Sequence, residues 1–280
     1  MSLDITIKQK FPHFKTLPLE LIIGTELEYG NYELMSLRIG ALGEQEIVLF
    51  HPKHIGRGFS IIWNEKEKKR VDLRLPSPST RFELGDLYRC VERIASYWNC
   101  EIEVNGSVVT IEEFRSGYQG MVEFEERALD YMCEKLIDGS NDSFTLFSAR
   151  WPLVMAKPEA EEFRGNPTRY AEWLHKKQDI TADYAEPLLY NTNEGLVARY
   201  IFADGVSMIF PKKPWLPPAA ENDGKCEKWI VSVFENLSGT QLCDIEYSEF
   251  LEKLMPYCTP YDTDHVICER LTLDQLKEII

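Results

Sequence analysis

The feature that most constrains the fold is a strand-like segment followed closely by an amphipathic helix. Residues 71–75, Val-Asp-Leu-Arg-Leu, alternate apolar and charged side chains, which places three apolar residues on one face of an extended strand. Residues 80–83, Thr-Arg-Phe-Glu, form a capping box, which is typical of a helix start. The apolar residues that follow recur at spacings of three and four: Leu84, Leu87, Val91, Ile94 and Trp98. We therefore expect this helix to cover the apolar face of a sheet.

Short strands, turns and separate helices continue along the chain. Strands are expected over residues 5–8, 32–39, 46–50, 59–63, 70–75, 144–147, 228–234 and 265–270. Asn105-Gly106 and Ala203-Asp204-Gly205 each lie between strand-like runs and predict hairpins. Further helices are expected after Thr110, over 122–137, after Asn166-Pro167, over 248–255 and after Thr272. The pattern predicts an α+β fold with antiparallel hairpins and segregated covering helices, because strands and helices do not alternate as in βαβ units.

The length of 280 residues suggests one large domain or two modest ones. Residues 138–142, Asp-Gly-Ser-Asn-Asp, contain only turn-forming residues and no apolar side chain. This stretch is the best candidate boundary. It predicts an N-terminal α+β domain over residues 1–140 and a C-terminal α+β domain over residues 141–280.

The charge balance excludes some classes of partner. The chain carries 31 Lys and Arg against 46 Asp and Glu, a formal net charge of -15, and the acidic excess is present in both halves. Such a protein is repelled at long range by nucleic acids and anionic membranes, so neither is an expected partner. No apolar run approaches the ~20 residues of a membrane span, and the N-terminus lacks a signal-type apolar core. We expect a cytoplasmic protein.

The seven cysteines include no Cys-x-x-Cys pair, so neither a disulfide framework nor a zinc ribbon is expected. The chain also lacks a phosphate-binding glycine loop, a zincin helix motif, a nucleophile elbow and a kinase signature. No cofactor is therefore expected. The absence of a catalytic signature favours a protein that is not an enzyme, although it leaves an unfamiliar activity open.

The segment from residue 51 to residue 58 is the richest in functional side chains. His51, His54 and Arg57 lie beside Gly56 and Gly58, which allow close backbone approach, so this segment could hold an anion. The structural alternative is a loop between strands in which Arg57 pairs with a surface carboxylate.

A second cluster of possible ligands lies near the C-terminus. It contains Asp262, Asp264 and His265, with Cys258 and Cys268 nearby. These mixed oxygen, nitrogen and sulfur donors have no recognised spacing, so a turn before a strand is the simpler interpretation and no metal site is predicted.

Two tryptophans are candidates for partner binding. Trp215 lies in the proline-rich segment of residues 211–218, which cannot enter a central strand, and Trp173 lies on the helix that ends in Lys176-Lys177. Each ring could instead pack within the fold.

Two stretches, read together, resemble a known family. They are Ile55–Phe59 and Val71–Thr80, the second running into the helix that carries Tyr88 and Cys90. The Asn105-Gly106 hairpin fits the same pattern. These features are similar to a family of uncharacterised bacterial proteins classed as a domain of unknown function. The resemblance covers residues 50–118, with a fainter echo over residues 209–214, and it implies a bacterial cytosolic protein without an assigned reaction.

Three functional hypotheses follow. The first is an adaptor or regulatory factor that acts through protein–protein contacts and presents its proline-flanked aromatic residues. The second is an enzyme of unfamiliar type whose small anionic substrate is held by His51, His54 and Arg57. The third is an inhibitor of a basic toxin or nuclease that mimics the charge of nucleic acid.

Overall fold

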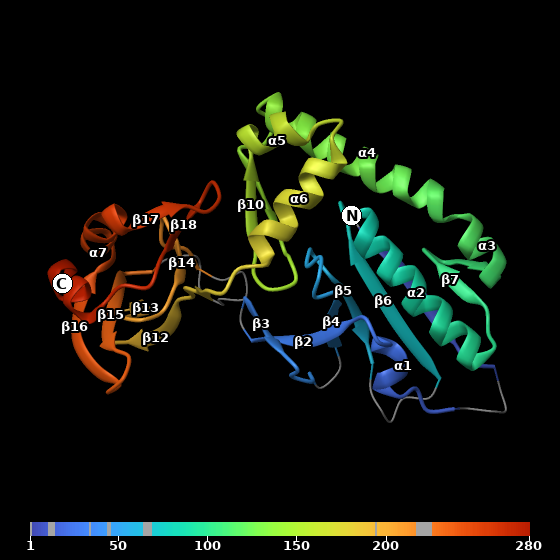
Figure 1. Ribbon diagram of the computed structural model, residues 1–280, viewed down its shortest axis with the longest axis horizontal. Coiled ribbons are helices and arrows are strands. Elements are labelled where there is room, and N and C mark those ends of the chain that lie inside the picture. Colours follow the sequence, from blue (N-terminus) through green and yellow to red (C-terminus); the bar gives the residue numbers. More distant parts are fainter. Residues whose placement is uncertain are drawn as a thin grey trace. The chain divides into compact units, whose positions relative to one another are not determined.

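The computed structural model describes residues 2–10, 15–33, 35–43, 46–63, 69–193, 195–216 and 226–280. The chain divides into two compact units, residues 1–179 and residues 180–280 (Figure 1). The turn at residues 138–142, where the sequence suggested a boundary between 1–140 and 141–280, lies inside the first of these units.

The first unit contains ten strands and six helices among its described residues. The strands are β1 Ser2–Lys8, β2 Glu28–Glu33, β3 Ser36–Ile39, β4 Glu46–Phe50, β5 Phe59–Ile62, β6 Arg70–Pro76, β7 Ile102–Val104, β8 Ser107–Val109, β9 Ser143–Leu146 and β10 Leu153–Ala156. The helices are α1 Leu19–Ile23, α2 Arg81–Trp98, α3 Ile111–Ser116, α4 Tyr118–Ile137, α5 Lys157–Phe163 and α6 Pro167–Gln178.

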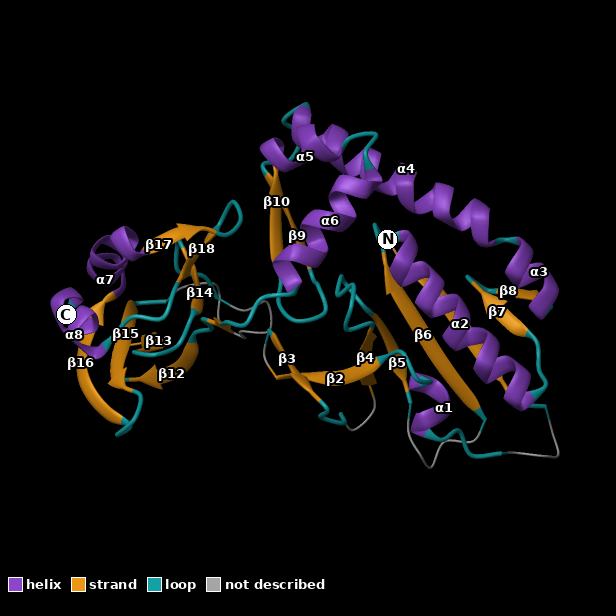
Figure 2. Cartoon of the chain, viewed as in Figure 1, coloured by secondary structure: helices purple, strands orange, loops and turns teal. Residues whose placement is uncertain are grey.

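Eight strands of the first unit form one sheet in the order β3-β2-β4-β5-β6-β1-β7-β8, and every neighbouring pair is antiparallel. The alternation in β6 has the predicted effect, since Val71, Leu73 and Leu75 are buried in the core. Helix α2 covers this face, and its capping box forms between Thr80 and Glu83 as predicted (Figure 2). The single strand expected over residues 32–39 is instead divided between β2 and β3, which pair with each other.

The remaining helices of the first unit lie beside α2 and the two-stranded β9–β10 sheet. Helix α4 packs against α5, and α5 packs against both α6 and β10. Two predicted caps are confirmed here, since Thr110 caps α3 and the Asn166 side chain accepts from the backbone N–H of Arg169 at the start of α6. Figure 1 shows α4 running away from α3 toward α5, and this long helix contacts α2, α3 and α5.

The second unit contains eight strands, three α- or 3₁₀-helices and two sheets in its described part. The strands are β11 Asp183–Tyr184, β12 Leu188–Thr192, β13 Gly195–Ala203, β14 Met208–Pro211, β15 Lys228–Glu235, β16 Thr240–Glu246, β17 Cys258–Pro260 and β18 His265–Cys268. The helices are α7 Tyr247–Leu254, the 3₁₀ helix η1 Met255–Tyr257 and α8 Leu273–Ile279. One sheet has the order β11-β14-β18-β17 and the other β12-β13-β15-β16.

The prediction of a hairpin around Ala203-Asp204-Gly205 is wrong. Strand β13 pairs with β12 and β15, whereas β14 pairs with β11 and β18, so this turn passes the chain from one sheet to the other. Both edges of β13 are already occupied, which leaves β14 no ladder to join there. The pairs β13–β15 and β11–β14 are parallel, and all other strand pairs in the described residues of this unit are antiparallel.

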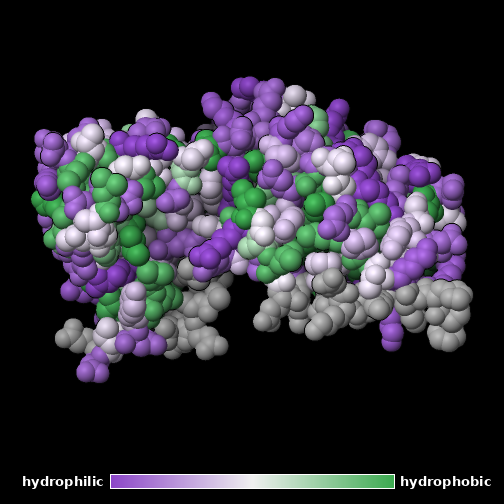
Figure 3. Space-filling view, turned by 60° about the horizontal axis from the view of Figure 1, so that its bottom comes forward, coloured by the Kyte–Doolittle hydropathy of each residue, from purple (hydrophilic) through white to green (hydrophobic). Residues whose placement is uncertain are grey.

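The architecture as a whole is α+β, as predicted, with helices and strands in largely separate runs. Among the described residues, no helix combines the length and the apolarity that crossing a bilayer requires. On the face drawn in Figure 3, hydrophobic surface residues form several separate patches between hydrophilic ones.

Candidate functional site

The loop that joins β4 to β5 owes its shape to a buried carboxylate on α2. Glu83 accepts hydrogen bonds from the backbone N–H groups of Arg57, Gly58 and Thr80. A Cβ atom at Gly56 would lie 2.7 Å from the Glu83 carboxyl group, and Gly58 adopts a φ of +68°. The two glycines therefore permit the close approach between the loop and α2.

Arg57 extends from this loop into the interior of the first unit. Its side chain is buried, with 7% of its surface exposed. Its Nε donates to the Phe147 carbonyl at 3.0 Å, and its Nη1 donates to the Pro78 carbonyl at 3.2 Å. Among the described residues no ion pair involves Arg57. The alternative in which Arg57 pairs with a surface carboxylate is thus not what the structure has.

Arg57 lines a pocket of about 420 Å³ that we call the arginine pocket. Helix α4, strand β9 and the loop before α2 form its walls. The side chains that matter for its chemistry are Arg57, Arg127, Ser77, Phe124, Tyr131 and Phe144. No carboxylate is among its described lining residues, and Arg127 takes part in no ion pair in the described part of the chain. The pocket therefore presents two unpaired cations beside three aromatic rings.

The buried carboxylates near Arg57 bind other groups. Besides the three amides held by Glu83, the Glu125 carboxylate accepts from the Ser77 hydroxyl and from the Ser79 backbone N–H, both at 2.9 Å. Burial raises the pKa of Glu125, while these hydrogen bonds and the charge of Arg57 oppose the rise. Neither carboxylate forms an ion pair with the Arg57 guanidinium, whose two hydrogen bonds in the described residues are both to backbone carbonyls.

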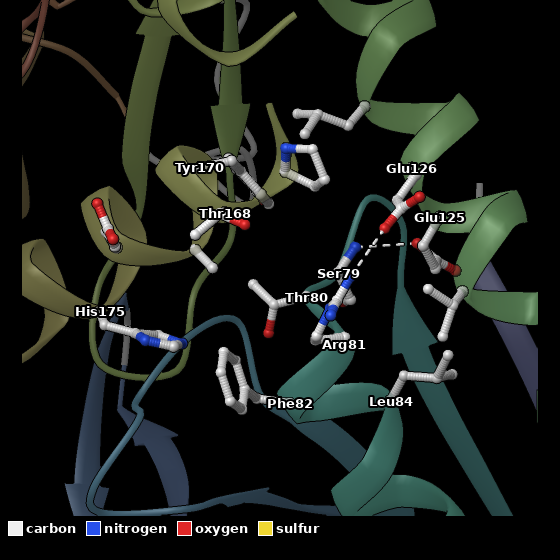
Figure 4. Close-up of a pocket in the computed structure, with 15 residues that line it drawn as sticks. Ser79, Thr80, Arg81, Phe82, Leu84, Glu125, Glu126, Thr168, Tyr170 and His175 are labelled. Atoms are coloured by element: carbon white, nitrogen blue, oxygen red, sulfur yellow. Dashed lines mark hydrogen bonds and ion pairs between the residues drawn. The ribbon is translucent and has the colours of Figure 1, made fainter. Parts of the chain in front are cut away.

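A second pocket, of about 340 Å³, lies on the other side of α4, and we call it the histidine pocket. In Figure 4 the start of α2 contributes Arg81 and Phe82, α4 contributes Glu125 and Glu126, and α6 contributes His175. Arg81 and Glu126 form an ion pair at 3.4 Å. Phe82 and His175 face each other across the opening, with ring centroids 5.5 Å apart.

Three imidazoles gather at this pocket. His51 and His54 are stacked with centroids 3.9 Å apart, and His54 lies 5.9 Å from His175. His54 Nε2 is 2.9 Å from the buried Asp86 carboxylate, which also accepts from Arg89. Burial, aided by the neighbouring His54, lowers the pKa of His175 to about 4. His175 is therefore a neutral imidazole at neutral pH.

The structure brings together only part of the predicted anion site. His51 and His54 contact each other and lie beside the histidine pocket, whereas the Arg57 guanidinium lines the arginine pocket. The residues are close in sequence, but the chain turns between them, so that the two histidines and Arg57 lie at different pockets.

The two tryptophans predicted to bind partners are half-buried. Trp173 packs against Phe163 and Tyr170, with centroid separations of 5.3 Å and 6.4 Å. The backbone of Trp215 is held by the Tyr200 hydroxyl, which its N–H contacts at 3.2 Å. Pro217 and Pro218, which follow Trp215 in the proline-rich segment, lie outside the described residues.

The C-terminal residues weighed as metal ligands are held in hydrogen bonds. Asp262 Oδ1 lies 2.8 Å from His265 Nδ1 and accepts the backbone N–H groups of Asp264 and His265, while His265 Nε2 lies 2.9 Å from the Tyr184 hydroxyl. No group of three or more potential metal ligands occurs in the described part of the chain. Asp262 closes a turn before β18, as the simpler interpretation expected.

Sequence reasoning missed Arg127, Phe124 and Tyr131, the α4 residues of the arginine pocket. The signal that could have identified them is a second stripe on α4. Phe124, Ala128 and Tyr131 recur at spacings of four and three, on a side away from the core residues Leu129 and Leu136. Tyr131 has 58% of its surface exposed, so this stripe does not belong to the core.

Comparison with known protein families gives one match. The family model described as Domain of unknown function (DUF4299) matches residues 2–279. The chain belongs to the DUF4299 family. The predicted resemblance to an uncharacterised domain family is therefore confirmed, and membership of DUF4299 extends it from residues 50–118 to nearly the whole chain. No curated protein and no solved structure matches the chain.

Proposed function

We propose that this protein binds a small anionic ligand with an aromatic or apolar part, and that the arginine pocket is its site. The observation that supports the proposal is that some arginines of the first unit form ion pairs with carboxylates and others do not. Arg81, Arg89 and Arg93 on α2 each form an ion pair with a carboxylate. Arg57 and Arg127 form none among the described residues, and both line one pocket.

The cost of burying Arg57 supports a role in binding. Taking a guanidinium out of water costs several kcal/mol unless an opposite charge and hydrogen bonds compensate. Two backbone carbonyls satisfy part of the donor capacity of Arg57, and a planar guanidinium has five N–H donors in all. Glu83 and Glu125 interact with the charge of Arg57 without forming an ion pair with it. A carboxylate or phosphate in the pocket would add a direct ion pair and accept guanidinium N–H groups in a bidentate arrangement.

The other lining residues set the shape of the ligand. Phe124, Tyr131 and Phe144 offer apolar faces for a ring or hydrocarbon part, and Ser77 and Thr145 offer hydroxyl groups. The pocket volume of about 420 Å³ falls in the range of pockets that hold metabolite-sized molecules. An uncharged ligand of the same size would form no ion pair with Arg57 or Arg127 and would bind less well.

This proposal keeps one residue of the anion hypothesis, Arg57, and replaces His51 and His54 with Arg127. The adaptor hypothesis receives less support, because Trp173 and the backbone of Trp215 are engaged within the fold. The inhibitor hypothesis needs a continuous acidic surface, whereas many described carboxylates pair with arginines. Ligand binding is the function that the contacts of the first unit support best.

Titration calorimetry with benzoate, phenylphosphonate, benzamide and benzylamine tests the proposal. We expect the two anions to bind more tightly than the neutral amide, and the amine to bind least. Arg127→Gln should weaken binding of the anions about tenfold or more, because a hydrogen bond to a charged partner contributes ~1.5–3 kcal/mol. Arg127 is exposed, so this substitution leaves the core unchanged.

Arg81→Gln is the matched control. Arg81 is also an exposed arginine at the edge of a pocket, but it is paired with Glu126. Its loss should leave anion affinity unchanged. Equal affinity for benzoate and benzamide, or equal anion affinity in the wild type and Arg127→Gln, would contradict the proposal.

A further inference from the structure

Two cysteines of the second unit lie directly opposite each other on neighbouring strands. Strands β17 and β18 are antiparallel, and their register pairs Cys258 with Cys268, Thr259 with Ile267 and Pro260 with Val266. Both cysteines are reduced. Side chains at directly opposed positions project from the same face of a sheet, so the two thiols are neighbours.

The hydrogen bonds at the turn define what kind of pair the two cysteines form. The Tyr261 N–H donates to the His265 carbonyl at 3.1 Å, so these two residues occupy a hydrogen-bonded position of the ladder, although the His265 N–H donates to Asp262 Oδ1. Bonded and non-bonded pairs alternate along an antiparallel ladder, so Pro260–Val266 is non-bonded, Thr259–Ile267 is bonded and Cys258–Cys268 is non-bonded. The position of Pro260, which has no N–H, agrees with this assignment.

A non-hydrogen-bonded pair has the spacing that a disulfide needs. Its Cα atoms are typically ~4.5 Å apart, which lies inside the ~4.4–6.8 Å range of disulfides. The strands would therefore move little when the sulfurs join.

The two thiols differ in burial and in the direction of their pKa shifts. Cys258 is half-buried at the edge strand β17, whereas Cys268 is fully buried. The Cys258 thiol donates to the Leu254 carbonyl at 3.5 Å and the Cys268 thiol to the Glu269 carbonyl at 3.4 Å. The neighbouring Cys268 thiol lowers the pKa of Cys258, and the same interaction together with burial raises the pKa of Cys268. Cys258 is thus the more accessible and the more readily ionised of the two, which suits an attacking thiol.

We propose that Cys258 and Cys268 are a thiol–disulfide exchange site that takes oxidised low-molecular-weight disulfides. The Cys258 thiolate attacks one sulfur of the disulfide, forms a mixed disulfide and releases one thiolate. The Cys268 thiol then loses its proton and attacks the Cys258 sulfur, which releases the second thiolate. Two protein thiols become one disulfide, the oxidant becomes two thiols, and the released thiolates take up the two protons.

Neither partly exposed cysteine elsewhere in the second unit has this arrangement. Cys243 in β16 stands opposite Val233 of β15, and Cys226 lies outside the strands. The exchange site is therefore a property of one strand pair. It lies in the unit that does not contain the arginine pocket, so it stands or falls separately from ligand binding.

Mass spectrometry of the native protein tests the proposal. The protein is incubated with oxidised glutathione, its free thiols are blocked with N-ethylmaleimide, and it is digested with trypsin. Cleavage after Lys253 and Arg270 leaves both cysteines in the peptide of residues 254–270. We expect this peptide to have lost two hydrogens and to carry no maleimide, and we expect dithiothreitol to restore blocking at both cysteines.

Substitutions and a denatured control complete the design. Cys258→Ser should abolish the two-hydrogen loss, whereas Cys243→Ser should leave it intact. The same reaction in urea should be slower, because the strands no longer hold the thiols together. Complete maleimide blocking of both cysteines after oxidation would overturn the proposal. A stable glutathione adduct on Cys258 that Cys268 does not displace, or equal rates with and without urea, would also overturn it.

Discussion

The arginine pocket and the histidine pocket share one helix but present different chemistry. Helix α4 gives Glu125 and Glu126 to the histidine pocket, and it gives Phe124, Arg127 and Tyr131 to the arginine pocket. The charged groups of the histidine pocket have partners, since Glu126 binds Arg81 and Glu125 binds two groups of the loop before α2. The arginines of the other pocket have no carboxylate partner among the described residues.

The difference teaches that a count of charged residues does not identify a binding site. The chain has a net charge of -15, which on its own suggests cationic partners. In the histidine pocket, however, Glu126 is occupied by Arg81, and Glu125 by a hydroxyl and a backbone amide. The charges of the arginine pocket have the minority sign and no carboxylate partner among the described residues, which is why we propose an anion as its ligand.

The largest expected effect on stability comes from removing the carboxylate of Glu125. Glu125→Ala leaves the buried Ser79 N–H without its partner and removes the acceptor of the Ser77 hydroxyl. We expect the free energy of unfolding to fall by about 3 kcal/mol, because buried groups bound to a charged partner lose their hydrogen bonds. Urea titration of the two proteins measures this.

Glu125→Gln is the companion variant. Its amide oxygen can still accept the Ser79 N–H, so its loss of stability should be clearly smaller. If both variants were as stable as the wild type, the loop between the pockets would not depend on Glu125, and the assignment of that carboxylate to an internal role would be wrong.

The histidine pocket should make the stability of the protein depend on pH through His175. The pKa of His175 is about 4 in the folded protein, against an ordinary value of 6.5, because burial disfavours its charged form. The unfolded chain therefore binds a proton first as the pH falls. The contribution of neutral His175 to the free energy of unfolding is complete above about pH 6.5. It is lost as the pH falls from about 6.5 toward about 4.

His175→Leu removes this contribution. Urea unfolding at about pH 7 and about pH 5 should show a smaller loss of stability on acidification for this variant than for the wild type. Since His175 is only partly buried, we expect the effect to be moderate. Identical losses in the two proteins would mean that the histidine pocket does not keep this imidazole neutral.

The smallest expected effect concerns the two exposed arginines. Arg81→Gln removes the surface ion pair with Glu126 and should lower the free energy of unfolding by less than about 1 kcal/mol. Arg127→Gln removes no ion pair and should lower it less still. Thermal denaturation at low and high salt compares them, because only the paired arginine should show a salt-dependent contribution. A larger destabilisation by Arg127→Gln would reveal an internal partner and weaken its assignment as a ligand contact.

Local patterns predicted the elements whose residues are neighbours in sequence. The capping boxes at Thr80, Thr110 and Thr272 form as expected, and so does the Asn105-Gly106 hairpin, where both residues adopt positive φ. The turn around Asp204 has the same local chemistry but joins two different sheets, because the partners available to β13 come from distant segments. Turn residues reverse the chain without specifying which strand it pairs with.

The arginine pocket lies beyond such reasoning for a related reason. Arg57 and Arg127 are distant in sequence, and nothing local indicates that a strand loop and the outer stripe of α4 line one space. Conversely, Arg57 is close to His51 and His54 in sequence, which suggested a shared site. In the structure the Arg57 guanidinium binds the Phe147 and Pro78 carbonyls, whereas His51 and His54 stack on each other.

The amino-acid sequence by itself determined the α+β class, the starts of the helices capped by Thr80, Thr110, Asn166 and Thr272, and the family, because caps, periodicity and turn residues act over a few positions. Only the tertiary structure decided which arginines remain without a carboxylate and which cysteines stand opposite each other. Those outcomes depend on contacts between segments far apart in the chain, and the energy of a buried charge or thiol is set by whichever groups the fold places beside it.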